Sequence, residues 1–159
     1  MPLRLLLVAL LALTLAGCQS APAVAIARQP EYFPTPLKAN PPLPFSEAVR
    51  VGDMLYLAGQ LGTLPGTTQV APGGIGPESR QVMDNIKAVL ERHGTSLEHV
   101  VKCTVFLADM KEWPAFNAIY REYFPLHFPA RSAFGTTGLA FGARVEVEVI
   151  AWIPPKAAP

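Results

Sequence analysis

Two acidic side chains near the C-terminal end of the chain are spaced for proton chemistry. Glu146 and Glu148 lie two positions apart, so in an extended strand both would point to the same face, where their like charges repel. A carboxyl group in such a place can take up and release protons during a reaction. A strand whose polar face is simply in contact with solvent has the same spacing, so the pattern alone leaves both interpretations open.

A single arginine is the natural partner for a small carboxylic acid. Arg131 stands in Pro129-Ala130-Arg131-Ser132, where the preceding prolines restrict the approach of the chain. A guanidinium group binds a carboxylate through two parallel hydrogen bonds. Its position is equally compatible with an ordinary surface arginine.

Other common chemistries have no support in the sequence. It contains no glycine-rich phosphate loop, no HExxH, no CxxC and no G-x-S-x-G. His93, His99 and His127 lack the spacing of metal ligands, so we expect no metal site. Cys103 lies among valines in an apolar stretch and is expected to be a buried, unreactive thiol.

The first half of the folded region predicts two strands and a helix. Residues 45–51 and 53–59 read as strands around the turn dipeptide Gly52-Asp53. Five glycines and two prolines make 60–76 a loop. A helix is expected from Pro77 to Gly94, with apolar residues on one face at Val82, Ile86, Val89 and Leu90.

The second half predicts two more strands, a helix between them and a final strand. Residues 100–107 and 131–136 read as strands, and a helix with aromatic residues at spacings of three and four begins near Asp109. Along 145–153 valines alternate with Glu146, Glu148, Ile150 and Trp152. The order β-β-α-β-α-β-β indicates an α+β domain with both helices on one face of a sheet. We expect the mixed opposite face to pack against another subunit.

The N-terminus reads as an export signal. Residues 1–17 combine Arg4 with an apolar run too short to span a bilayer, as in a signal peptide. Leu15-Ala16-Gly17-Cys18 resembles the lipobox of bacterial lipoproteins, which makes Cys18 the expected site of lipidation. With Gln19 next, we expect a lipoprotein of the cell envelope that faces the periplasm, held in the outer membrane by default. The alternatives are an ordinary signal peptide with an incidental cysteine and a buried apolar N-terminus.

The remaining chain divides into a spacer, one domain and a short tail. Proline-rich residues 18–43 are expected to form an extended tether, 44–155 the domain, and 156–159 a tail. Removal of residues 1–17 would remove only Arg4 from the 13 basic side chains, which leaves 12 against 12 acidic ones. A nucleic-acid partner is not expected, since such proteins show a basic excess or stripe.

Several segments in register resemble the RidA/YjgF family of imine deaminases. They are Pro44 to Gln60, Asp84-Asn85-Ile86-Lys87-Ala88-Val89-Leu90, Val101 to Met110, Asn117, Pro129-Ala130-Arg131-Ser132, and Val145 to Ala151. The resemblance implies a chorismate-mutase-like α+β fold, a homotrimer with clefts between subunits, and hydrolysis of 2-imino or enamine acids to 2-keto acids and ammonia without a metal or organic cofactor. It assigns Arg131 to the substrate carboxylate and Glu146 to the attacking water. Asn117 and Gly59 match the cleft wall.

Four positions depart from the family pattern. Phe45 stands where the deaminases usually have a tyrosine, Ala58 where serine is frequent, Ala133 where cysteine is frequent, and Glu47 where glutamine is common. The substrate-binding set implied by the resemblance, which includes Phe45, Ala58 and Ala133, is therefore less polar than usual. Two alternatives follow: a non-catalytic module that binds a small carboxylate, and, with less support, an endoribonuclease like some relatives.

Overall fold

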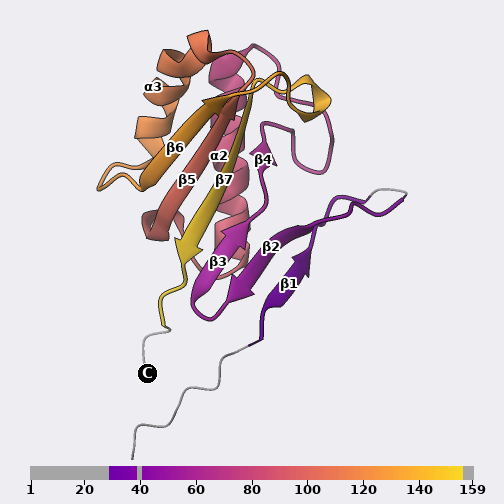
Figure 1. Ribbon diagram of the computed structural model, residues 1–159, viewed down its shortest axis with the longest axis vertical. Coiled ribbons are helices and arrows are strands. Elements are labelled where there is room, and N and C mark those ends of the chain that lie inside the picture. Colours follow the sequence, from indigo (N-terminus) through magenta and orange to yellow (C-terminus); the bar gives the residue numbers. More distant parts are fainter. Residues whose placement is uncertain (1–28, 39–40, 156–159) are drawn as a thin grey trace, which may run out of the picture.

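The computed structural model describes residues 29–38 and 41–155. Within them a single mixed sheet packs against helices (Figure 1). The strands are β1 (Glu31–Pro34), β2 (Ser46–Val51), β3 (Met54–Leu57), β4 (Gln60–Leu61), β5 (Val100–Leu107), β6 (Ala130–Gly135) and β7 (Val145–Trp152). The α-helices are α2 (Ile75–Arg92) and α3 (Trp113–Tyr123), and three short 3₁₀ turns are η1 (Leu97–His99), η2 (Met110–Glu112) and η3 (Ala140–Gly142).

The last strand is the centre of the sheet. The order is β1-β2-β3-β7-β5-β6, and β4 also pairs with β7 beyond the end of β3. All pairs are antiparallel except β5 with β6, which are parallel because α3 connects them. The β2–β3 hairpin turns at Gly52, whose φ of 59° suits the left-handed region. Since β6 is last in this order and pairs only with β5, it forms an edge of the sheet, beside α3 (Figure 1).

Both helices cover one face of the sheet, as the order of the elements predicted. The inward residues of β7, from Val145 to Ala151, are buried, whereas the alternate positions Glu146 to Trp152 are partly or fully exposed. The core cluster joins these inward residues to the apolar face of α2 and to the aromatic face of α3; its members include Val82, Met83, Ile86, Leu90, Phe116 and Tyr120. No described helix covers the other face. The mixed α+β class is therefore confirmed.

Two strands were not expected. The proline-rich stretch assigned to an extended tether, residues 18–43, contains β1, which pairs antiparallel with β2. Phe33 explains the attachment, since it packs on the core cluster and its ring lies 4.3 Å from the ring of His93. Pro34 is tolerated because β1 is an edge strand. In the expected loop 60–76, β4 pairs with β7, and Thr63 bridges Val70.

The helices and caps differ only slightly from expectation. The first begins at Ile75 rather than Pro77, which occupies its third position, and ends at Arg92. Asp109 accepts a hydrogen bond from the backbone N–H of Lys111 at 2.9 Å, although it caps the short turn η2 rather than α3 itself. The expected strand 131–136 is β6, and 145–153 is β7.

The expected signal peptide 1–17, Cys18 and the tail 156–159 lie outside the described residues. Among the residues that are described, no helix is both long enough and apolar enough to cross a membrane.

Candidate functional site

Arg131 lies on the helix-covered face of the sheet. In the parallel β5–β6 pair it is opposite Cys103, which is fully buried in the core cluster, and paired residues point to the same face. Its guanidinium carbon is 4.5 Å from the ring centre of Tyr120 and 4.8 Å from that of Trp113. Both rings belong to α3, so cation–π contacts hold the guanidinium against that helix.

One nitrogen of the Arg131 guanidinium lacks a hydrogen-bond partner. Its Nη1 atom is buried and has no hydrogen-bond partner among the described residues. A buried donor without a partner is costly in a folded protein and calls for an explanation. A hollow of about 340 Å³ adjoins it, lined by Asn117, Tyr120, Arg121, Phe128, Pro129 and Arg131. The hollow therefore places the unpartnered Nη1 of Arg131 beside two further polar residues, Asn117 and Arg121, where a small anion can bind.

Glu146 lies on the opposite face of the sheet. It is paired with Phe106 on β5 and with Leu61 on β4, and it alternates with the buried Val145 and Val147. Partial burial, and then the neighbouring charge of Glu148, raise the pKa of Glu146 above its usual range. Such a group exchanges protons closer to neutral pH than a free carboxylate, which suits general acid–base chemistry.

Gly59 lies directly against the Glu146 carboxylate. A Cβ atom added at Gly59 would be 2.8 Å from Cδ and 3.1 Å from Cγ of Glu146, and closer still to Oε1. Only glycine allows this approach of backbone to side chain. The two residues come from segments almost ninety positions apart, joined through the β4–β7 pairing.

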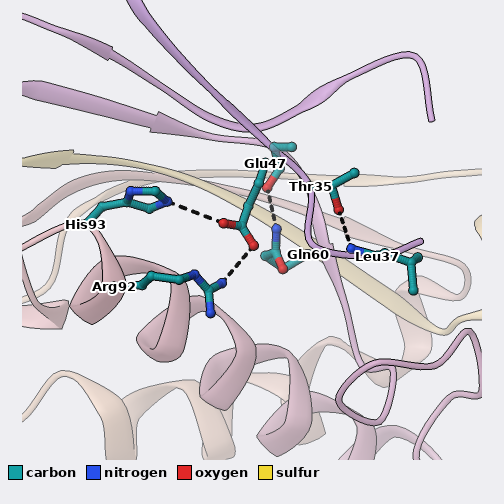
Figure 2. A network of polar contacts seen from close by, with 7 residues as sticks. Thr35, Leu37, Glu47, Gln60, Arg92 and His93 are labelled. Carbon is teal, nitrogen blue, oxygen red and sulfur yellow. Dashed lines mark hydrogen bonds and ion pairs between the residues drawn. The ribbon is translucent and has the colours of Figure 1, made fainter. Parts of the chain in front are cut away.

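A second hollow, of about 350 Å³, extends from Gly59. Phe45 and Gly59 line it, together with Thr35 to Leu37, Glu47, Gln60, the 61–67 loop, α2 and Phe141. Figure 2 shows the polar part of its wall: Oε1 of Glu47 accepts from Nη2 of Arg92 at 2.7 Å, and Oε2 is 3.3 Å from Nε2 of His93. The backbone carbonyl of Glu47 accepts from the N–H of Ala58 at 2.9 Å, which holds the residue before Gly59.

Within one copy of the chain, the structure thus separates the expected site residues into two groups. Arg131 and Asn117 line the first hollow, whereas Phe45 and Gly59 line the second and Glu146 abuts Gly59. Ala133, two positions after Arg131, shares its face and packs on the core cluster. Ala58 is held by Glu47 and lines neither hollow. Arg131 and Glu146 face opposite sides of the sheet and do not meet.

Several contributors to these hollows were not singled out from the sequence. Trp113 and Tyr120 were recognised only as a helical aromatic stripe, and that spacing was the available signal. No local sequence pattern pointed to Arg92 or Phe141, because the fold alone brings α2 and the 139–142 turn to the second hollow. Within residues 29–38 and 41–155, no three His, Cys, Asp or Glu side chains gather as a metal ion would require.

Comparison with protein families gives one match that covers most of the chain. The model of the family described as endoribonuclease L-PSP matches residues 37–153. Among curated proteins, a 2-iminobutanoate/2-iminopropanoate deaminase of Capra hircus is 44% identical over 108 residues, which are 68% of this chain and 79% of the relative. The human protein of that name is 39% identical with the same coverage.

Solved structures of the same family superimpose on this chain. A putative endoribonuclease L-PSP from Entamoeba histolytica superimposes with a TM-score of 0.70 at 41% identity, over 78% of this chain and 99% of that one. The YjgF gene product of E. coli gives a TM-score of 0.65 at 33% identity, over 70% and 89% of the two chains.

Proposed function

The chain belongs to the endoribonuclease L-PSP (RidA/YjgF) family, and from that premise we propose that it hydrolyses 2-imino acids to 2-keto acids and ammonia. The observation that carries the proposal is the buried, unpartnered Nη1 of Arg131 beside a hollow that holds Asn117. A substrate carboxylate would supply the missing acceptor. The curated relatives named as 2-imino acid deaminases support this choice of acid.

The site is complete only when a second copy of the chain contributes. Arg131 and Glu146 are on opposite faces of the sheet in one copy, so a single substrate cannot contact both. The uncovered face carries Glu146, Ile150 and Trp152 as well as Phe134, a mixture that suits a subunit interface. In a closed homotrimer, the Arg131 hollow of one subunit would face the Glu146 and Gly59 of the next.

The reaction needs only positioning and proton transfer. An imine carbon is already electrophilic, so Arg131 holds the carboxylate while Glu146 accepts a proton from a water molecule. The oxygen of that water forms a bond to the imine carbon as the C=N π bond breaks, and Glu146 passes its proton to the nitrogen, which gives a carbinolamine. Glu146 then takes the proton of the new hydroxyl group and transfers it to the nitrogen. The C–N bond breaks as the C=O bond forms, which releases ammonia and leaves a 2-keto acid. The raised pKa of Glu146 suits both transfers.

The test is hydrolysis of imines generated in situ by an amino-acid oxidase, with semicarbazide as the competing trap. The full chain, Arg131→Ala, Arg131→Lys and Glu146→Gln are compared. We expect the parent to reduce semicarbazone formation and all three variants to lose most of that activity, the lysine variant because it cannot bind a carboxylate bidentately. Equal background rates in parent and variants would refute the proposal.

A binding module without turnover is the second candidate. Phe45 and Ala58 remove the hydroxyl groups that deaminases commonly place in the cleft, which favours binding over proton transfer. Calorimetry with 2-oxobutanoate separates the two: binding that needs Arg131, in the absence of any imine hydrolysis, would select the binding module.

We also infer a location from the N-terminal sequence. Lipidation of Cys18 would hold the domain in the bacterial periplasm, anchored by default to the outer membrane, since several acyl chains make anchoring effectively permanent. The imines would then come from amino-acid oxidising enzymes in the same compartment.

A further inference from the structure

We propose that the hollow between Gly59 and Phe141 is a side-chain subsite that selects 2-imino acids with bulky apolar side chains, aromatic ones above all. The inference rests on the proposed function, and it concerns which imine is hydrolysed rather than whether one is. In that reaction the imine carbon must lie near Glu146, and Gly59 is the residue in contact with Glu146. Gly59 also lines the second hollow, so a substrate whose imine carbon lies at Glu146 can extend its side chain past Gly59 into that hollow.

The hollow has the size and lining that such a side chain needs. Its volume of about 350 Å³ exceeds what a methyl or ethyl group would fill, and it falls within the range of small-molecule sites. Apolar groups reach it from separate parts of the chain, and they include Leu37, Phe45, Leu61, Leu64, Val89 and Phe141. Burial of an aromatic ring among such groups is strongly favourable.

The polar groups at the wall are already committed to one another. Both carboxylate oxygens of Glu47 have partners, at 2.7 Å in Arg92 and 3.3 Å in His93 (Figure 2). Nε2 of Gln60 donates to the carbonyl of Ala58 at 3.2 Å. The wall thus presents a neutralised pair rather than a free charge. Phe45, which stands where the family usually has a tyrosine, lowers the polarity of the same region.

Phe141 is the strongest single indication. It is the one residue other than glycine with a positive φ among the described residues, at φ 58° and ψ 18°. Residues with a Cβ adopt this left-handed conformation at an energetic cost, and such strain concentrates at functional sites. Phe141 is also 57% exposed, so packing inside its own subunit covers less than half of the side chain. Its place on the rim of the hollow gives the ring a role as a wall for the substrate.

The experiment compares side-chain preference in the parent, Phe141→Asn and Leu37→Ala. Asparagine tolerates the left-handed conformation, so the turn is kept while the ring is lost. Imines are generated in situ from phenylalanine, leucine and alanine, and kcat/KM is measured for each. Tyr32→Asn is the matched control, because Tyr32 is an aromatic residue that is 68% exposed and lines neither hollow.

We expect the parent to prefer the phenylalanine-derived imine over the alanine-derived one. Phe141→Asn should lower the ratio of kcat/KM for the phenylalanine-derived imine to kcat/KM for the alanine-derived imine by roughly tenfold, as loss of an apolar contact in a specificity pocket does. Tyr32→Asn should leave the preference unchanged.

A parent that hydrolyses the alanine-derived imine best, or a Phe141→Asn variant that lowers all three rates equally, would overturn the subsite and leave the deaminase intact. A parent inactive on every imine would refute the proposed function itself. Native mass is recorded for each variant; if Phe141→Asn changes the assembly, Leu37→Ala decides, because it alters the same hollow from another segment.

Discussion

Replacing Gly59 with alanine tests whether the position of the Glu146 carboxylate controls the reaction. The added Cβ would lie 2.8 Å from Cδ of Glu146, whereas ordinary van der Waals contact begins near 3.4 Å. Because Oε1 is closer still, the carboxylate must move by roughly 1 Å, and a misplacement of that size costs on the order of 100-fold in rate. The carboxylate is the free end of a half-buried side chain, so it can swing away without disturbing the core.

The assay is kcat/KM for imine hydrolysis, measured beside the free energy of unfolding in urea. We expect Gly59→Ala to lose about two orders of magnitude in activity and less than about 1 kcal/mol in stability, because the change displaces one flexible side chain. Gly76→Ala is the matched control: its added Cβ meets nothing within 4 Å, and alanine suits its place in α2. An active Gly59→Ala enzyme with the parent's rate would show that Glu146 does not act at this spot.

Three further predictions concern stability and anchoring. Because the pKa of Glu146 is raised, the folded state holds its proton more tightly than the unfolded chain, and the free energy of unfolding falls as pH rises through the folded pKa. Glu146→Gln should therefore be more stable than the parent at pH 7 and match it below pH 4. Urea unfolding at both pH values measures this difference. Glu78 is 2% exposed, and its carboxylate accepts hydrogen bonds from the backbone N–H groups of Arg144 at 2.6 Å and Val145 at 3.2 Å. Glu78→Ala should therefore lower the free energy of unfolding by roughly 3 kcal/mol, because it leaves these buried donors without an acceptor. A loss of less than about 1 kcal/mol would contradict this account. Cys18→Ser should abolish incorporation of labelled palmitate and membrane retention in a bacterial host, and unchanged labelling would exclude Cys18 as the acylated residue.

Local patterns in the sequence specify the individual helices, strands and turns. The apolar spacing of 82–90 predicted α2, Gly52 predicted the hairpin turn, and the alternation along 145–152 predicted both a strand and its buried face. These features depend on neighbours one to four positions away, which a sequence displays directly. Residue types also raised Arg131 and Glu146 as candidates for chemistry, although a surface arginine and a solvent-facing strand fitted equally well, and the family resemblance assigned their roles.

Long-range pairing fixes which strand each segment joins and toward which face each side chain points. Within the proline-rich stretch 18–43, residues 31–34 form β1 because β2 supplies the hydrogen bonds and Phe33 packs on the core. Similarly, the parallel register with β5 turns Arg131 toward the rings of α3 and away from Glu146. These outcomes follow from pairing between segments that are distant in sequence, and no local pattern encodes a register between strands. The separation of the two candidate residues within one subunit is for that reason a property of the fold rather than of either residue's neighbours.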